Sequence, residues 1–168
     1  MHLRAFAIGL LLLGSIVISF LPASAGSEES RLPLPRFVSL RAEEANMRTG
    51  PGEQYPIKWT YQRPGLPLEV IREFHHWRRV RDWQGSEGWM HSSMLSSKRS
   101  VMVVGEIRTL RDEPDARSGA AARIEGPVIG KLLRCEKSSD WCRVEFGGVK
   151  GWLRRNEMWG VYDQEEVN

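Results

Sequence analysis

The sequence predicts an all-β protein of two small tandem β-barrels, preceded by a signal peptide and a short flexible leader. Short alternating or apolar runs are separated by glycine- and proline-containing turns, and no segment between residues 37 and 162 keeps a 3.6-residue period long enough for a substantial helix. Motifs of the first half recur in the second half at offsets of 63 or 64 residues. This register indicates two copies of one unit of about sixty residues.

The N-terminus has the pattern of a secretory signal peptide over residues 1–25. Arg4 supplies a positive region, residues 5–21 are mostly apolar, and Ala23-Ser24-Ala25 is a small-residue cleavage site before Gly26. The alternative is a retained membrane anchor, but the apolar run is shorter than the ~20 residues that a spanning helix prefers. No second apolar stretch follows, and no cysteine stands at the cleavage site to carry a lipid. We expect a periplasmic or secreted mature chain without a transmembrane segment.

The leader is expected over residues 26–36, because its Gly, Ser, Glu and Pro composition cannot bury much apolar surface. The alternative is that its Leu-Pro-Leu-Pro segment, residues 32–35, binds a neighbouring groove. The remaining chain is divided by the repeat. The first domain is expected at residues 37–99, the second at residues 100–162, and a C-terminal tail at residues 163–168.

The charge of the chain is balanced. It has 24 basic and 21 acidic residues, and removing the signal peptide removes one basic residue and no acidic residue, which leaves a net charge of +2. This balance argues against a nucleic-acid-binding protein and is compatible with weak attraction to anionic wall polymers.

The strands of the first copy are expected in the order in which their patterns occur. Residues 37–41 form the opening strand, and the alternation over residues 57–61 and the β-rich run 68–71 predict two more. Gly50-Pro51-Gly52 predicts a tight loop, because each glycine allows a positive φ and the proline ring fixes its own φ. The last two strands are expected at residues 77–80 and 88–90.

Three motifs pair the two copies. They are Met47-Arg48 with Leu110-Arg111, residues 77–80 (Trp-Arg-Arg-Val) with 141–144 (Trp-Cys-Arg-Val), and Gly88-Trp89-Met90 with Gly151-Trp152-Leu153. The opening strand also falls opposite residues 100–104, so no long linker remains and the barrels are expected to abut. A domain of ~60 residues buries only about 60% of its unfolded surface, so contact between the copies or a covalent crosslink would add stability.

Together, residues 46–52, Tyr55, and residues 68–71, 77–80 and 85–90 resemble the full pattern of a bacterial Src-homology-3-like (SH3b) domain. The second copy resembles it more loosely, since Asp112-Glu113-Pro114-Asp115 replaces the glycine-rich turn. The resemblance implies two partly open SH3-like barrels. It also implies non-catalytic recognition modules of the kind that target bacterial cell-envelope proteins to peptidoglycan or to partners.

Outward aromatic side chains are the candidate ligand-binding residues. Side chains alternate across a strand, so an inward Val80 places Trp77 outwards, and an inward Met90 places Trp89 outwards near Trp77. Aromatic residues at the matching positions line the peptide groove in the eukaryotic relatives of this fold. The alternative is that these rings cap the barrel or pack between the copies. The hypothetical set also contains Tyr55, Trp59, Arg79, Trp141 and Trp152.

The two cysteines predict a disulfide. Cys135 and Cys142 flank a polar turn between two β-like runs, so they would face each other across a hairpin. An even pair in an oxidising compartment is typical of a structural bridge. The alternatives are a redox-active pair or a metal site, which the absence of a close C-x-x-C spacing and of any histidine in the second copy disfavours.

The sequence holds no convincing catalytic pattern. His75-His76 and His91-Ser92-Ser93 suggest a Ser/His or metal site, but adjacent histidines on a strand point to opposite faces. No H-E-x-x-H, G-x-S-x-G or phosphate-binding glycine loop is found. We therefore expect no enzyme activity, no cofactor and no metal. The run of residues 78–81 is interpreted as a solvated strand face, with an anion contact for Arg79 or Arg81 as the alternative.

These observations and the resemblance predict a secreted binding or scaffolding module of the bacterial cell envelope. The expected ligand is a peptide, either a stem peptide of peptidoglycan or an extended segment of an envelope protein partner. One alternative is a targeting or regulatory subunit of a cell-wall-acting enzyme. Another is a structural subunit whose outward tryptophans are buried against a partner chain. No oligomeric state is predicted.

Overall fold

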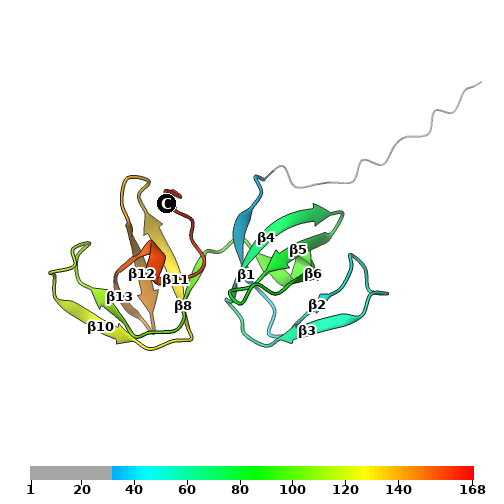
Figure 1. Cartoon of the computed structure of the whole chain (residues 1–168), viewed down its shortest axis with the longest axis horizontal. Helices are drawn as coiled ribbons and strands as arrows, with labels where there is room; N and C mark the ends of the chain where they lie inside the picture. The colour runs from blue at the N-terminus through cyan, green and yellow to red at the C-terminus, as the bar shows by residue number, and fades with distance from the viewer. Residues whose placement is uncertain (1–31) are drawn as a thin grey trace, which may run out of the picture.

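The computed structural model describes residues 32–168, so the predicted signal peptide and residues 26–31 of the predicted leader lie outside the described residues. The described chain forms two β lobes (Figure 1). The first lobe contains β1 (Arg36–Leu40), β2 (Ala45–Arg48), β3 (Ile57–Tyr61), β4 (Pro67–Phe74), β5 (Trp77–Arg81), β6 (Glu87–His91), the 3₁₀ turn η1 (Ser92–Met94) and β7 (Leu95–Ser96). The second contains β8 (Ser100–Val103), β9 (Arg108–Arg111), β10 (Ala120–Ile124), β11 (Val128–Cys135), β12 (Trp141–Phe146), β13 (Val149–Arg154) and the 3₁₀ turn η2 (Arg155–Glu157).

The two lobes have the same strand order. The first sheet runs β3-β2-β6-β5-β4-β1-β7 and the second runs β10-β9-β13-β12-β11-β8, with antiparallel neighbours throughout. The correspondence is exact except for the short edge strand β7. Within residues 32–168 the helical structure is limited to two 3₁₀ turns of three residues each. The predicted fold class, two tandem SH3-like barrels, is confirmed.

Each lobe has its own apolar core, built from the inward positions of its strands. Val80 and Met90 of the first lobe are completely buried, and so are Val144 and Leu153 at the matching positions of the second. Burial alternates along β6, where Gly88 and Met90 are buried between half-buried neighbours. This alternation is the one expected for strands with one face on the core.

In the glycine-rich loop of the first lobe, residues 50–52, the glycines pack closely against nearby side chains of the same loop. Neither Gly50 nor Gly52 has a positive φ, so the prediction of left-handed glycines around Pro51 is wrong. A Cβ on Gly50 would instead lie 2.4 Å from Cδ1 of Tyr55, and one on Gly52 would lie 2.3 Å from the side-chain oxygen of Gln54. The glycines are required because the loop folds tightly over its own side chains.

The adjacent histidines were expected on a strand, and this prediction is also wrong. His75 and His76 form the turn between β4 and β5, and His75 has a φ of 50°. A two-residue turn of this kind requires a left-handed residue, so the alternation argument does not apply to this pair. Among residues 32–168 no group of three or more His, Cys, Asp or Glu side chains is arranged to hold a metal ion.

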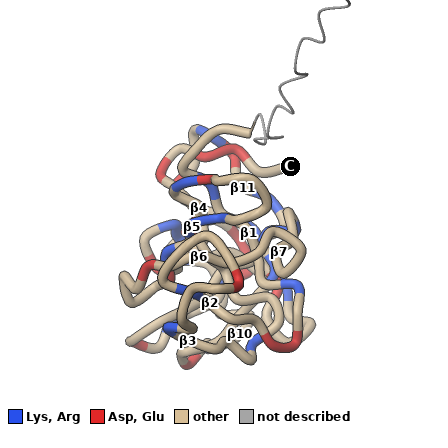
Figure 2. Tube along the Cα trace, turned by 90° about the vertical axis from the view of Figure 1, so that its right-hand side faces the viewer, with Lys and Arg blue, Asp and Glu red and all other residues tan. Residues whose placement is uncertain are grey.

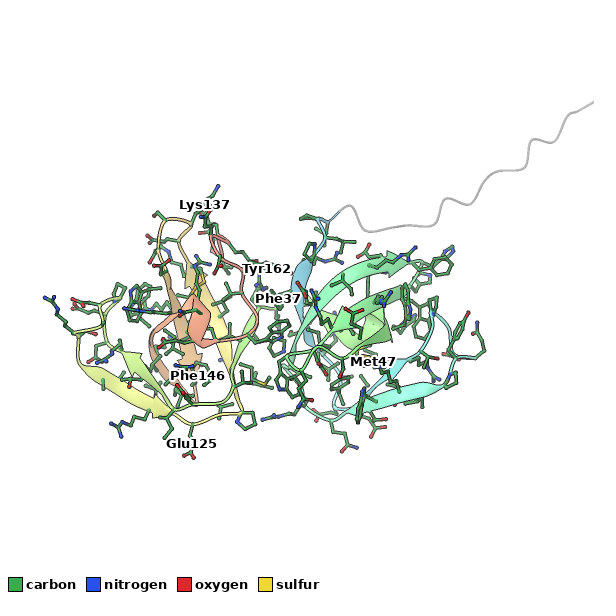
Figure 3. The ribbon with its side chains drawn as sticks, in the orientation of Figure 1. Phe37, Met47, Glu125, Lys137, Phe146 and Tyr162 are labelled. Carbon is green, nitrogen blue, oxygen red and sulfur yellow. A yellow bond between two sulfur atoms is a disulfide. The ribbon has the colours of Figure 1, made fainter. Side chains whose placement is uncertain are left out.

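Three aromatic side chains form the centre of the interface between the lobes. The rings of Trp159 and Phe37 meet edge to face with centroids 5.1 Å apart, and the ring of Tyr162 lies 4.6 Å from that of Phe37. Phe37 and Tyr162 lie next to each other between the lobes (Figure 3). The indole N–H of Trp159 donates a hydrogen bond to the carbonyl of Pro67 at 3.2 Å. The barrels therefore abut, as the sequence predicts.

Apolar and polar contacts extend this interface. Met102 of β8 is completely buried in the core of the first lobe, and Ile129 of β11 packs against that core. The hydroxyl of Tyr162 donates to the buried carboxylate of Glu69 at 2.8 Å, and the Nε–H of Arg81 donates to its other oxygen at 2.8 Å. Burial and the bond to Glu69 raise the pKa of Tyr162 above its ordinary value, which keeps this hydroxyl a donor.

Residues 163–168, predicted as a tail, pack along the second lobe. Val167 and Cys135 exchange backbone hydrogen bonds of 2.8 and 2.9 Å, and the side chain of Val167 packs against the core of this lobe. Glu165 accepts a hydrogen bond from Arg99 at 3.1 Å. Basic and acidic residues are interspersed in the view of Figure 2, in keeping with the balanced net charge. Over residues 32–168, no helix has the length and apolar character needed to span a bilayer.

The predicted disulfide is confirmed. Cys135 and Cys142 are directly paired across the β11–β12 hairpin with a Cα–Cα distance of 4.4 Å, and both are almost completely buried. We expect the double variant Cys135→Ser, Cys142→Ser to lower the free energy of unfolding by about 2–3 kcal/mol, because the short closed loop restricts the unfolded chain. Urea denaturation of the oxidised protein, the reduced protein and the variant measures the effect. Equal stability of the oxidised protein and the variant would contradict it.

Candidate binding grooves

The outward tryptophan of the first lobe lies beside a histidine. Trp77 opens β5 and is paired across the sheet with His91, the last residue of β6. The two rings meet edge to face with centroids 5.4 Å apart, and both side chains are half-buried. Because Val80 faces the core, Trp77 lies on the outer face of the sheet.

These two rings form one wall of a hollow of about 200 Å³, here called groove 1. Its other walls come from β2 and the residue before it, the loop that follows β2, and η1. Groove 1 is lined by Glu44, Ala45, Asn46, Arg48, Glu53, Trp77, His91 and Met94.

The second lobe has a hollow of about 280 Å³ at the matching place, here called groove 2. Trp141 takes the place of Trp77, and Arg154 takes the place of His91 as its cross-strand partner. The guanidinium carbon of Arg154 lies 5.1 Å from the centroid of the Trp141 ring. Groove 2 is lined by Ile107, Arg108, Thr109, Arg111, Ala116, Trp141, Arg154 and Glu157.

The repeated Met-Arg and Leu-Arg motif builds one wall of each groove. Its apolar member, Met47 or Leu110, is completely buried. Arg48 donates to the carbonyls of Glu53 and Tyr55 at 3.0 and 2.9 Å, and Arg111 donates to the carbonyl of Ser118 at 2.9 Å. Each arginine therefore holds the loop after its strand against the groove. The repeat at positions 48 and 111 could have indicated this role, which the sequence analysis did not assign.

Trp89 lies on the outer face of β6 but outside groove 1. Its partners across the sheet are Arg48 on β2 and Arg79 on β5. The residue directly opposite Trp77 is His91, which was not among the predicted ligand-binding residues. Arg79 forms an ion pair with Glu87 at 2.9 Å on the same outer face.

The other predicted aromatic residues are spread over the surface. Trp59 is 55% exposed on the edge strand β3, and Tyr55 is 39% exposed above the glycine-rich loop. Trp152 of β13 is half-buried and lies opposite Arg111 on β9. None of the three lines groove 1 or groove 2.

A further cleft of about 1020 Å³ lies between the two lobes. Its walls include apolar side chains of both lobes, among them Leu40 and Leu133, and basic side chains, among them Arg41, Lys98 and Lys131. The sequence repeat does not indicate this cleft, because the cleft depends on how the two copies pack against each other.

The strand order, the small cores and the groove beside an outward tryptophan define each lobe as an SH3-like barrel. A family model described as bacterial SH3 domain matches residues 41–97 and again residues 104–160. The chain therefore belongs to the bacterial SH3 domain family, with two domains in tandem.

Among solved structures, the chain is similar to NlpC1 and NlpC2 from Trichomonas vaginalis, with 10% and 11% sequence identity and a TM-score of 0.35 for each. These matches cover 80% and 79% of this chain and 49% and 51% of those chains. An NlpC/P60 family protein from Bacillus cereus ATCC 10987 matches with 15% identity and a TM-score of 0.33, over 79% of this chain and 58% of that one. The chain thus spans about half the length of these structures. No curated protein matches it.

Proposed function

We propose that the protein is a binding or scaffolding module of the bacterial cell envelope, and that groove 1 holds an extended peptide. The stem peptide of peptidoglycan is the favoured ligand, and a segment of an envelope protein is the second candidate. The observation that carries the proposal is the half-buried Trp77 ring beside groove 1, which recurs with Trp141 beside groove 2. A recurring aromatic wall beside a hollow is typical of peptide recognition.

The chemistry of groove 1 suits a peptide with both apolar and polar groups. The Trp77 ring offers an apolar wall, and Met94 from η1 offers a second apolar surface. Glu44 and Glu53 place two carboxylates at the same groove, which can accept hydrogen bonds from amino or amide groups. A few polar groups around an apolar wall fix the orientation of a bound ligand.

The disulfide supports the proposed location. Structural disulfides persist in oxidising compartments such as the periplasm and the cell exterior. Cys135 and Cys142 are bonded and buried, so the bridge is part of the core of the second domain. Together with the signal peptide predicted at residues 1–25, this supports secretion.

Replacing Trp77 with alanine tests the proposal. We expect Trp77→Ala to weaken retention on purified peptidoglycan sacculi by roughly thirtyfold, because aromatic anchors commonly contribute more than about 2 kcal/mol to binding. The domain should stay folded, since the ring lies outside the buried core. Co-sedimentation with sacculi measures retention, and circular dichroism monitors folding.

The matched control is Phe74→Ala, which removes another aromatic ring from the same hairpin. Phe74 is 47% exposed and lies outside groove 1, so this variant should bind sacculi like the original protein. Equal loss in both variants, or unaltered retention of a folded Trp77→Ala protein, would contradict the proposal. Hydrolysis of sacculi by the purified protein would favour a cell-wall-acting enzyme instead.

A further inference from the structure

We propose that groove 2 is a carboxylate-binding site, distinct in ligand chemistry from groove 1. This inference rests on the proposed function, because it assigns to the second domain the acidic groups of the same peptide class. The two grooves occupy matching places in the repeat, yet their charged residues differ. Groove 2 is lined by three arginines and one glutamate, whereas groove 1 is lined by one arginine and two glutamates.

The first contribution to the site is a stacked guanidinium. The guanidinium carbon of Arg154 lies over the ring of Trp141, 5.1 Å from its centroid, and the Arg154 side chain is exposed to solvent. Among residues 32–168 no carboxylate forms an ion pair with Arg154, although Asp140 and Asp163 line a neighbouring hollow that Arg154 shares. An exposed guanidinium that lies over an aromatic ring and forms no ion pair can bind a carboxylate through two parallel hydrogen bonds.

The second contribution is the guanidinium of Arg108, whose acidic partner is weak. The Nε–H of Arg108 is inaccessible to solvent and has no hydrogen-bond partner within the part of the chain that the structure describes. Its terminal nitrogen Nη1 lies 3.6 Å from Glu106, whose side chain is 84% exposed, so this pair is weak. Because solvent cannot reach this Nε–H, a ligand carboxylate would bind at the terminal nitrogens of Arg108, which the weak pair with Glu106 leaves available.

The acidic residue of groove 2 leaves the arginines available. Glu157 accepts the backbone N–H of Arg154 at 2.9 Å, so one of its oxygens is used within the chain. Arg111 uses one terminal nitrogen for the carbonyl of Ser118 and forms no ion pair with an acid among residues 32–168. The groove therefore presents a net positive charge to a ligand.

The size of the groove restricts the ligand class. A hollow of about 280 Å³ suits a single small residue that carries a carboxylate, such as the C-terminal residue of a short peptide. A C-terminal amide of the same shape would keep the contact with Trp141 but lose the charge-assisted hydrogen bonds.

The experiment uses the full two-domain protein and two probes, acetyl-Ala-Ala-Ala with a free C-terminal carboxylate and the same peptide as the C-terminal amide. The indole N–H resonance of Trp141 reports binding during an NMR titration. We expect the carboxylate peptide to shift this resonance and to bind roughly tenfold more tightly than the amide. Arg154→Gln should weaken binding of the carboxylate peptide by a similar factor, and added salt should weaken it in the original protein.

Arg134→Gln is the control, because it removes an arginine of the same domain that lies outside groove 2. It should bind the carboxylate peptide like the original protein. If Arg154→Gln does not fold, Arg108→Gln provides the same test at the second guanidinium. Equal binding of the two peptides, or unaltered binding by a folded arginine variant, would overturn the inference.

The two experiments distinguish a failure of the carboxylate site from a failure of the proposed function. If sacculi bind through Trp77 while the carboxylate peptide leaves Trp141 unperturbed, only the carboxylate site is wrong. If the peptide binds at Trp141 while sacculi are not retained, the carboxylate site stands and the peptidoglycan proposal fails.

Discussion

Gly88→Ala is expected to unfold the first domain. A Cβ at this position would lie 2.6 Å from Cγ of Met47 and 2.8 Å from the carbonyl oxygen of Arg48. The oxygen belongs to the backbone of β2 and cannot move without breaking the contact between β2 and β6. We expect a loss of about 3 kcal/mol or more, the upper part of the range for overpacked cores. A single core of this size supplies only about 3–5 kcal/mol, so little stability would remain.

The repeat provides an internal check on this prediction. In the second domain, a Cβ on Gly151 would lie 2.6 Å from the carbonyl oxygen of Arg111 and 2.6 Å from Cγ of Leu110, so Gly151→Ala should destabilise that domain similarly. Ser86→Ala on the β5–β6 hairpin is the control, and we expect its effect to stay within about 0.5 kcal/mol. Urea denaturation of the three variants measures the free energies. A Gly88→Ala protein as stable as the Ser86→Ala control would contradict the argument.

Gly88 also shows how much of the fold can be predicted from the sequence. The recurrence of Gly88-Trp89-Met90 as Gly151-Trp152-Leu153 predicted two equivalent strands, and the structure confirms both as β6 and β13. Met90 is completely buried, as the alternation argument assumed, and Leu153 is buried at the matching position of the second domain. The reason for the glycine could not be predicted, because the close approach involves a strand about forty residues away in the chain.

The interface was predicted only as a contact between the copies. Its aromatic residues, Phe37, Trp159 and Tyr162, have no aromatic counterparts at the repeat offset of 63 residues, where Ser100, Ser96 and Arg99 stand. The motifs that the two copies share therefore do not include these residues. An interface between two unlike faces instead requires residues that differ between the copies, so departures from the repeat are the signal that could have indicated it.

The candidate grooves were predicted in part. The alternation around Val80 placed Trp77 on the outer face, where it lines groove 1. The other residues of groove 1 come mainly from β2, the loop after it and η1, which are distant from Trp77 in the sequence. Sequence motifs alone therefore did not group them with Trp77. The opposite charge of the two grooves depends on pairs such as His91 and Arg154, which the shared motifs do not include.

Trp159→Ala is expected to uncouple the two domains and to lower the free energy of unfolding by about 3 kcal/mol, the lower end of the range for a buried tryptophan, since this side chain is half-buried. The substitution removes the ring that meets Phe37 at 5.1 Å and the N–H that bonds to Pro67 at 3.2 Å. It also opens space beside Met102, which the second domain contributes to the core of the first.

Urea denaturation followed by two probes distinguishes loss of coupling from general weakening. With the interface intact, both domains should unfold in one cooperative transition, and in the variant the transitions should separate. Trp59→Ala removes the same residue type from the exposed strand β3, so it should leave one transition with almost unchanged stability. Because Trp159 lines neither groove, the variant also tests whether their fixed arrangement matters for binding a polymer at two sites. A single transition at the original urea midpoint would show that the aromatic contact does not couple the domains.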